Sequence, residues 1–140
     1  MLAVGVMSGP VNADATSTPF EMAVFKSPTC GCCVKWVEYM RLNGFKIDVY
    51  DEADLTAVKR YYGVTQSLAS CHTAVVDGYV IEGHVPAADV RRLLKERPAV
   101  RGLTAPGMPQ FSPGMGSETP RGYDVLSFDD GGNVEVYSQY

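Results

Sequence analysis

Hydrophobic and polar positions recur along the chain with two different periods, and the shorter period predicts four strands. Residues 21–25 include a continuous apolar run, which is typical of a buried strand. Residues 45–50 alternate between apolar and polar side chains, which predicts a second strand. Two further strands, 73–76 and 79–82, are joined by Asp77-Gly78, a dipeptide that favours a tight hairpin.

Three segments show the three- and four-residue spacing of helices. The first is predicted from Cys30 to Asn43, after the strand break at Ser27-Pro28-Thr29. The second, 51–62, has acidic residues in its first turn and basic residues near its end. The third, 87–97, stops before a proline. The inward faces of the first and third helices are predicted to be Cys33, Trp36, Val37 and Met40, and Val90, Leu93 and Leu94.

The resulting β-α-β-α-β-β-α order over 21–97 predicts an α/β fold, a small mixed sheet flanked by helices on both faces. A Cys-x-x-Cys directly after the first strand, at the start of the first helix, is the thioredoxin-like arrangement. Residues 98–122 are rich in proline, glycine and methionine and predict a long loop. A β-hairpin of 123–128 and 134–137 follows, so we expect one domain over 21–140, made of a core (21–97) and an extension (98–140).

Composition narrows the function classes. The chain has 140 residues, enough for one ordinary domain, with 46% hydrophobic and 20% charged residues as in globular proteins. Its net charge is -4 and its lysines and arginines are scattered, which argues against nucleic-acid binding. No apolar run approaches the ~20 residues of a membrane-spanning helix.

The N-terminal segment 1–20 resembles part of a secretion signal. Residues 2–7 are uncharged and mostly apolar, and Ala13-Asp14-Ala15 has the small-x-small form of a signal-peptidase site, although a basic beginning is missing. A disordered tail is the alternative. If the segment is a truncated signal peptide, the mature protein works in the periplasm, where unprotected thiols tend to be oxidised.

The four cysteines are Cys30, Cys32, Cys33 and Cys71. On a helix, Cys30 and Cys33 lie on one face about 5–6 Å apart, and the free N–H groups at a helix start stabilise thiolates. Such a pair suits either disulfide exchange or metal binding. Cys32 is about 100° round the helix from Cys33, so three sulfurs do not easily converge on one tetrahedral ion. They could instead line one side of a site in which bridging sulfurs bind several metal ions.

Further candidate ligands lie downstream. Cys71-His72 stands at the start of the third strand, where thioredoxin-like folds commonly have a cis-proline facing the Cys-x-x-Cys motif. His84, just before the third helix, is either a solvated cap or a ligand. Met108 and Met115 either offer thioethers or pin the loop to the core. Thiolate and thioether ligands select Cu(I) over zinc, and imidazole suits both metals.

Four segments in this order resemble the CopG-like copper-resistance family, long catalogued as a domain of unknown function: Thr29-Cys30-Gly31-Cys32-Cys33, Ser70-Cys71-His72-Thr73-Ala74, Gly78-Tyr79-Val80-Ile81-Glu82-Gly83-His84-Val85-Pro86, and Gly107-Met108-Pro109 with Ser112-Pro113-Gly114-Met115. The resemblance covers about residues 21–140. It implies a periplasmic thioredoxin-like protein that binds several Cu(I) ions in a cysteine-bridged cluster.

The resemblance also implies roles for residues and partners. Cys30, Cys32, Cys33 and Cys71 would be the bridging thiolates, and His72, His84, Met108 and Met115 fall in matching segments. The family is linked to copper tolerance and efflux, including Cu(I)/Cu(II) interconversion, so a periplasmic copper efflux or chaperone protein is the expected partner. Two alternatives stay open from the residues alone: a thiol–disulfide oxidoreductase using Cys30 and Cys33, and a structural zinc site.

Overall fold

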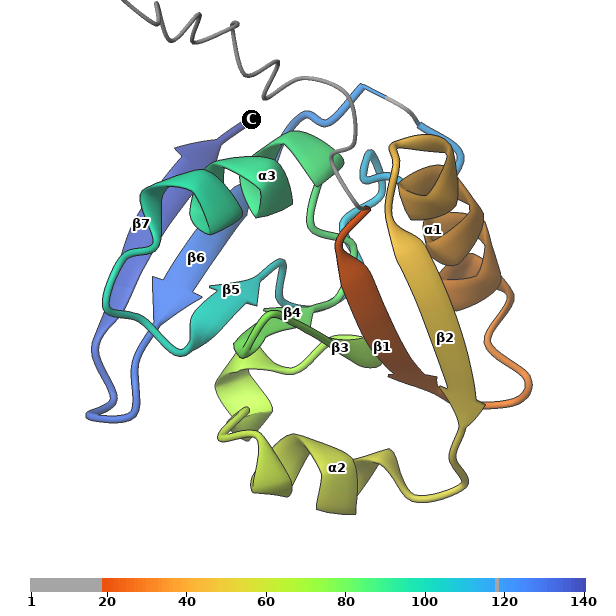
Figure 1. The fold of residues 1–140 in the computed structure, drawn as a ribbon, viewed down its shortest axis with the longest axis horizontal. Coiled ribbons are helices and arrows are strands. Elements are labelled where there is room, and N and C mark those ends of the chain that lie inside the picture. The colour runs from red at the N-terminus through yellow and green to blue at the C-terminus, as the bar shows by residue number, and fades with distance from the viewer. Residues whose placement is uncertain (1–18, 118) are drawn as a thin grey trace, which may run out of the picture.

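A computed structural model describes residues 19–117 and 119–140, so most of the segment predicted to be a signal peptide lies outside the described residues. The strands form one seven-stranded sheet of order β2-β1-β3-β4-β5-β6-β7 (Figure 1). The β1–β2 and β4–β5 pairs are parallel and the others antiparallel, which confirms the mixed α/β sheet. The strands are β1 (Glu21–Lys26), β2 (Lys46–Asp51), β3 (His72–Val76), β4 (Tyr79–Glu82), β5 (Gly102–Thr104), β6 (Asp124–Phe128) and β7 (Val134–Gln139).

Helices cover both faces of this sheet. They are α1 (Gly31–Leu42), α2 (Leu55–Tyr61) and α3 (Ala87–Glu96), with a short 3-10 helix, η1 (Gln66–Leu68). The larger hydrophobic cluster joins the sheet to α1 and α3, and it includes the predicted inward residues Trp36, Val37, Met40, Val90, Leu93 and Leu94. A smaller cluster on the opposite face consists of Val64, Leu68, Val80 and Phe128. None of the helices in the described part of the chain is long and apolar enough to cross a membrane.

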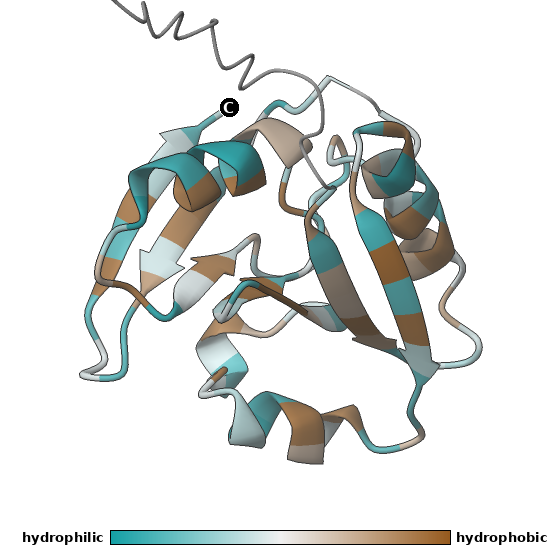
Figure 2. Ribbon diagram, viewed as in Figure 1, coloured by the Kyte–Doolittle hydropathy of each residue, from teal (hydrophilic) through white to brown (hydrophobic). Residues whose placement is uncertain are grey.

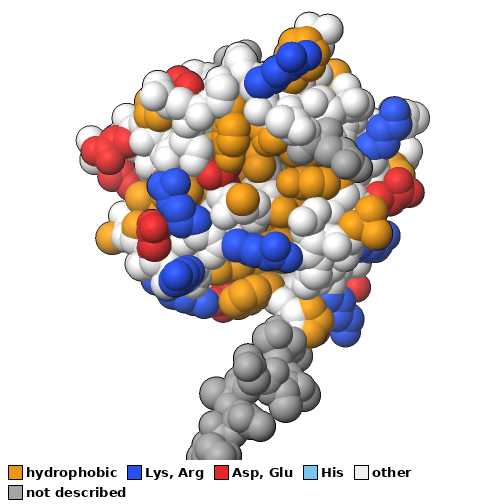
Figure 3. All heavy atoms as spheres, turned by 90° about the horizontal axis from the view of Figure 1, so that it is seen from above, with side chains coloured by type: hydrophobic (Ala, Val, Ile, Leu, Met, Phe, Trp, Pro, Cys, Tyr) orange, Lys and Arg blue, Asp and Glu red, His pale blue; other side chains and the backbone are white. Residues whose placement is uncertain are grey.

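The hydropathy along β2 and the spread of basic side chains both agree with the sequence analysis. Hydrophilic and hydrophobic residues alternate along β2, as expected for a strand with one buried face (Figure 2). On the face seen from above, lysine and arginine side chains are spread among hydrophobic and uncharged ones rather than gathered in one patch (Figure 3).

The second helix begins later than the sequence predicted. β2 extends to Asp51, and α2 starts only at Leu55. Asp54 is the N-cap, because its side chain accepts hydrogen bonds from the backbone N–H groups of Thr56 (3.1 Å) and Ala57 (3.3 Å). Of the acidic residues that suggested a first helical turn, Asp51 ends β2 and Asp54 is the helix cap.

The long loop predicted over 98–122 contains a strand that the sequence analysis missed. β5 pairs in parallel with β4, and Leu103 at its centre is fully buried. Gly102 makes the pairing possible, since a Cβ at this position would lie 1.9 Å from the Val80 carbonyl oxygen. Three residues are too few for alternation to be recognised, and this explains the omission.

A buried ion pair ties β4 to α2 and to the start of β3. The Glu82 side chain is fully buried and accepts hydrogen bonds from Lys59 Nζ, from Thr73 Oγ1 (2.7 Å) and from the Ser70 N–H (3.3 Å). Burial raises the pKa of Glu82, and the Lys59 ammonium opposes that rise. Because Ser70 and Thr73 flank Cys71-His72, this network fixes the backbone on both sides of two candidate ligands.

Replacing Lys59 by methionine is expected to lower the free energy of unfolding by about 3–5 kcal/mol, because a buried carboxylate is left without its counter-ion. Chemical denaturation measures the loss. The loss of unfolding free energy should become smaller as the pH is lowered, since a protonated Glu82 needs no counter-ion. Lys46→Met is the control, since it breaks an exposed pair with Glu21 worth about 1 kcal/mol or less. Equal losses in the two variants would contradict the prediction.

Candidate metal centre

The sheet register brings the cysteine motif and the start of β3 together. β1 and β3 are antiparallel with Lys26 opposite His72, so the beginning of β3 lies beside the end of β1. The chain leaves β1 through residues 27–29 and enters α1, whose N-cap is Cys30. Cys71, one residue before β3, therefore faces the first turn of α1.

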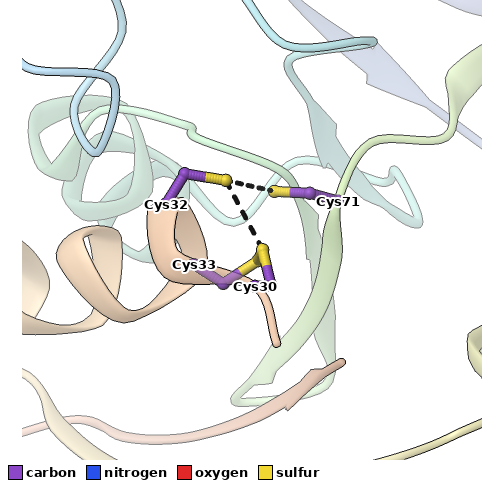
Figure 4. Close-up of side chains that lie close together, drawn as sticks. All are labelled: Cys30, Cys32, Cys33 and Cys71. Carbon is purple, nitrogen blue, oxygen red and sulfur yellow. Dashed lines mark hydrogen bonds between the residues drawn. A yellow bond between two sulfur atoms is a disulfide. The ribbon is translucent and has the colours of Figure 1, made fainter. Parts of the chain in front are cut away.

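Four sulfur atoms meet at this point. Cys30 and Cys33 are joined in a disulfide, with Cα atoms 5.4 Å apart, which agrees with the predicted spacing. Cys32 and Cys71 are free thiols, and each is partly exposed. The Cys32 sulfur lies 3.4 Å from that of Cys30 and 4.0 Å from that of Cys71 (Figure 4). Cys32 thus stands between the disulfide and the second free thiol.

The expectation that these sulfurs diverge round a helix was wrong in one respect. The sulfurs of Cys30, Cys32, Cys33 and Cys71 all lie within 4.8 Å of one another. Cys30 is the N-cap, with extended backbone (φ -81°, ψ 96°), and does not follow helical geometry. Its sulfur is therefore both bonded to that of Cys33 and 3.4 Å from that of Cys32, which joins the two sides of the helix.

Two buried imidazoles extend the cluster on the Cys71 side. His84 Nε2 is 3.2 Å from the Cys71 sulfur, and His72 Nδ1 is 3.4 Å from it. The ligand atoms of Cys71, His72 and His84 also lie within 4.8 Å of one another. His84 is only 1% exposed and the N-cap of α3 is Pro86, so the interpretation of His84 as a solvated cap is wrong.

The place expected for a cis-proline is taken by this pair without a cis bond. β3 begins at His72, and the described residues contain no cis peptide. Cys71 precedes the strand and follows the bridge between Ser70 and Gly107. Because Cys71 lies outside the regular ladder, it is not bound by strand alternation, and it can face the same site as His72.

Burial keeps the Cys71 thiol and the two imidazoles uncharged at neutral pH. Burial, together with the neighbouring Cys32, raises the pKa of the Cys71 thiol to about 12. Burial also lowers the pKa of His84 to about 4, and with His84 and Lys59 nearby it holds that of His72 well below its usual range. The imidazoles therefore offer lone pairs to a metal, whereas the Cys71 thiol must first lose its proton.

The predicted thioether residues lie on the loop that packs against this site. Met108 is 49% exposed, and Met115 is partly buried. The Gly107 N–H donates to the Ala69 carbonyl (3.1 Å), which holds the Met108 end of the loop beside the segment that precedes Cys71. Gly114 packs so closely that a Cβ there would lie 2.9 Å from the Cys32 carbonyl oxygen. Ligation by either methionine stays a prediction.

Two residues of the site were not recognised from the sequence. Trp36 was assigned to the core, and it is buried there, but its ring also packs on the His72 ring at 4.3 Å. Ser112 is fully buried and contacts His84 Nδ1 at 3.1 Å. The only available signal for Ser112 was its place in the segment 112–115, where the methionine alone was singled out.

The donor set is soft. Thiolate sulfur favours Cu(I), as do the thioethers offered by the loop after β5, and two sulfurs with two imidazole nitrogens also suit zinc. Three segments far apart in sequence supply the sulfur and nitrogen atoms: the N-cap and first turn of α1, the start of β3 and the residues just after β4. The loop after β5 contains the two candidate thioethers.

Comparison with known proteins agrees with this geometry. A family described as "Protein of unknown function, DUF411" matches residues 68–115, which include Cys71, His72, His84, Met108 and Met115. No curated protein matches the chain. Two solved structures named "Copper resistance protein copG", Form 2 and Form 1, are each 42% identical to it and cover 88% of it. The chain covers 99% and 98% of them, with TM-scores of 0.82 and 0.81. The chain therefore belongs to the CopG family of copper-resistance proteins.

Proposed function

We propose that this protein binds several Cu(I) ions in the periplasm through a cysteine-bridged cluster and thereby supports copper resistance. Its ligands would be Cys30, Cys32, Cys33, Cys71, His72, His84, Met108 and Met115. It would buffer copper or pass it to an efflux or chaperone protein, with Cu(I)/Cu(II) interconversion as a redox step. The observation that carries the proposal is the convergence of four cysteine sulfurs within 4.8 Å of one another, beside two buried imidazoles.

The arrangement of donors supports several ions rather than one. The four sulfurs form one group, Cys71 with His72 and His84 forms another, and Cys71 belongs to both. A thiolate shared between two groups of ligands is what a bridging sulfur requires. A single tetrahedral ion would use only four of these donors.

The state of the disulfide determines how many donors are free. With Cys30 and Cys33 bonded, the remaining cysteine and histidine donors are Cys32, Cys71, His72 and His84, which suffice for one ion. Two electrons and two protons convert the disulfide into two thiols, and a dithiol reductant supplies them. The multinuclear cluster therefore belongs to the reduced protein.

A thiol–disulfide oxidoreductase is the second candidate function, and one specific observation favours it. Cys30 and Cys33 are already bonded, and the Cys32 sulfur is 3.4 Å from that of Cys30, close enough for exchange after modest movement. In this alternative Cys71 is dispensable. In the copper proposal Cys71 is the donor common to both groups.

Copper stoichiometry tests the proposal directly. Titrated with Cu(I) under anaerobic native mass spectrometry, the reduced full chain should take up several ions cooperatively, and the disulfide form about one. Cys71→Ser should abolish the cooperative uptake, whereas Ser67→Ala, which alters an exposed hydroxyl hydrogen-bonded to Thr65, should not. A single zinc in the reduced protein would favour a structural zinc site. Insulin reduction that survives Cys71→Ser would favour the oxidoreductase.

Cu(I) affinity should rise with pH. Because the Cys71 pKa is about 12, the metal-free thiol stays protonated between pH 6 and 8, and binding must displace that proton. Each displaced proton contributes about a tenfold gain in apparent affinity per pH unit. The histidines are already neutral in this range, so they add no slope.

Competition with a colorimetric Cu(I) chelator at several pH values measures this slope. Cys71→Ser should reduce it by one proton. An affinity that is flat from pH 6 to 8 in the wild-type protein would show that Cys71 does not bind the metal as a thiolate.

A further inference from the structure

The buried Ser112, on the loop after β5, contacts the ring nitrogen of His84 that is not near Cys71. The Ser112 hydroxyl lies 3.1 Å from His84 Nδ1 and donates its hydrogen bond to the Pro109 carbonyl at 2.7 Å. A hydroxyl has a single hydrogen, and here it is committed to a carbonyl, which can only accept. Toward His84, the serine oxygen is therefore an acceptor, and the proton of that contact belongs to Nδ1.

This contact determines which nitrogen of His84 has a free lone pair. A neutral imidazole has one N–H, so a proton on Nδ1 leaves Nε2 bare. Nε2 is the nitrogen that points to the Cys71 sulfur, at 3.2 Å. We infer that Ser112 is a positioning residue that fixes the His84 tautomer, so that Nε2 is presented to copper before any metal arrives. The inference rests on the proposed function, because it assigns the outer partner of a ligand in that same site.

The surrounding loop holds the serine in place. Ser112 is fully buried, its N–H donates to the same Pro109 carbonyl (3.2 Å), and its own carbonyl accepts from the Met115 N–H (3.0 Å). Gly114, at φ +102°, lies where a Cβ would approach His84 Cε1 to 3.3 Å. The turn therefore closes over the imidazole, and its buried hydroxyl holds the position that solvent would otherwise take.

His72 lacks an equivalent partner. Its Nδ1 lies 3.4 Å from the Cys71 sulfur, but its buried Nε2 has no hydrogen-bond partner among the described residues. The Gly83 backbone acts on this ring by hydrogen bonding, but no side-chain hydroxyl among the described residues lies behind it as Ser112 does behind His84. The two histidines are thus unequal, and His84 is the one prepared as a ligand. Metal-binding histidines are normally oriented in this way by a hydrogen bond to their other nitrogen.

The tautomer can be measured without copper. In the metal-free full chain with its disulfide intact, long-range ¹H–¹⁵N correlation spectra should show His84 with Nδ1 protonated and Nε2 bare. Ser112→Ala should give a mixture of tautomers. Ser117→Ala is the matched control, because its hydroxyl lies in the same loop and donates to the Thr119 carbonyl. A wild-type His84 protonated on Nε2 would overturn the inference.

Copper binding supplies the second readout. Ser112→Ala should weaken Cu(I) binding to the reduced protein by about 10–100-fold, with Ser112→Thr closer to wild type and Ser117→Ala unchanged. Wild-type affinity in Ser112→Ala would overturn the inference. So would weakened binding with an unaltered His84 tautomer, because that result means a purely structural role. A wild-type chain that binds no Cu(I) would overturn the proposed function, while the spectra would still decide the role of Ser112.

Discussion

The antiparallel register between β1 and β3 is the constraint on which the site depends. It sets Lys26 opposite His72 and Val24 opposite Ala74, so His72 shares the α1 side of the sheet with the core residue Ala74. Side chains alternate along a strand, so a slip of one residue would exchange His72 and Thr73 between the two faces. His72 would leave the Trp36 ring, and Thr73 would leave Glu82. The cluster of sulfur and imidazole atoms exists only in the observed register.

Buried polar groups on both faces enforce that register. On the α2 side, Glu82 binds Thr73 and Ser70, which flank the two ligands. On the α1 side, the Trp36 indole N–H donates to the Val85 carbonyl (3.0 Å), next to His84. A buried ion pair is weak evidence for stability, because desolvation offsets its attraction. Here its effect is specificity: an alternative register would leave a carboxylate or an ammonium buried without a partner, which is far more costly.

Sequence alone predicted the order of the strands and α-helices over residues 21–97 and the soft character of the candidate ligands, because both are encoded locally. Strand alternation and helical spacing depend on neighbours in the chain, and they located β1 to β4 and the buried faces of α1 and α3. The geometry depends on contacts between distant segments. The hydroxyl of Ser112 meets a histidine 28 residues earlier. β5 is defined by pairing with β4 and not by its own pattern, and Cys30 takes cap geometry that helical spacing does not describe.

The charge state of the Cys71 group gives a physical reason for the monovalent metal of the proposed function. The Cys71 group contains one neutral thiol and two neutral imidazoles, because burial opposes charge on each. If Cu(I) took the place of the Cys71 proton, one positive charge would replace another, and these three ligands with their ion would stay neutral. A divalent ion at the same three ligands would leave a net positive charge in an apolar environment, and an uncompensated buried charge costs several kcal/mol. In the proposed function, this charge balance at Cys71, His72 and His84 would favour Cu(I) over a divalent ion, in addition to the softness of sulfur.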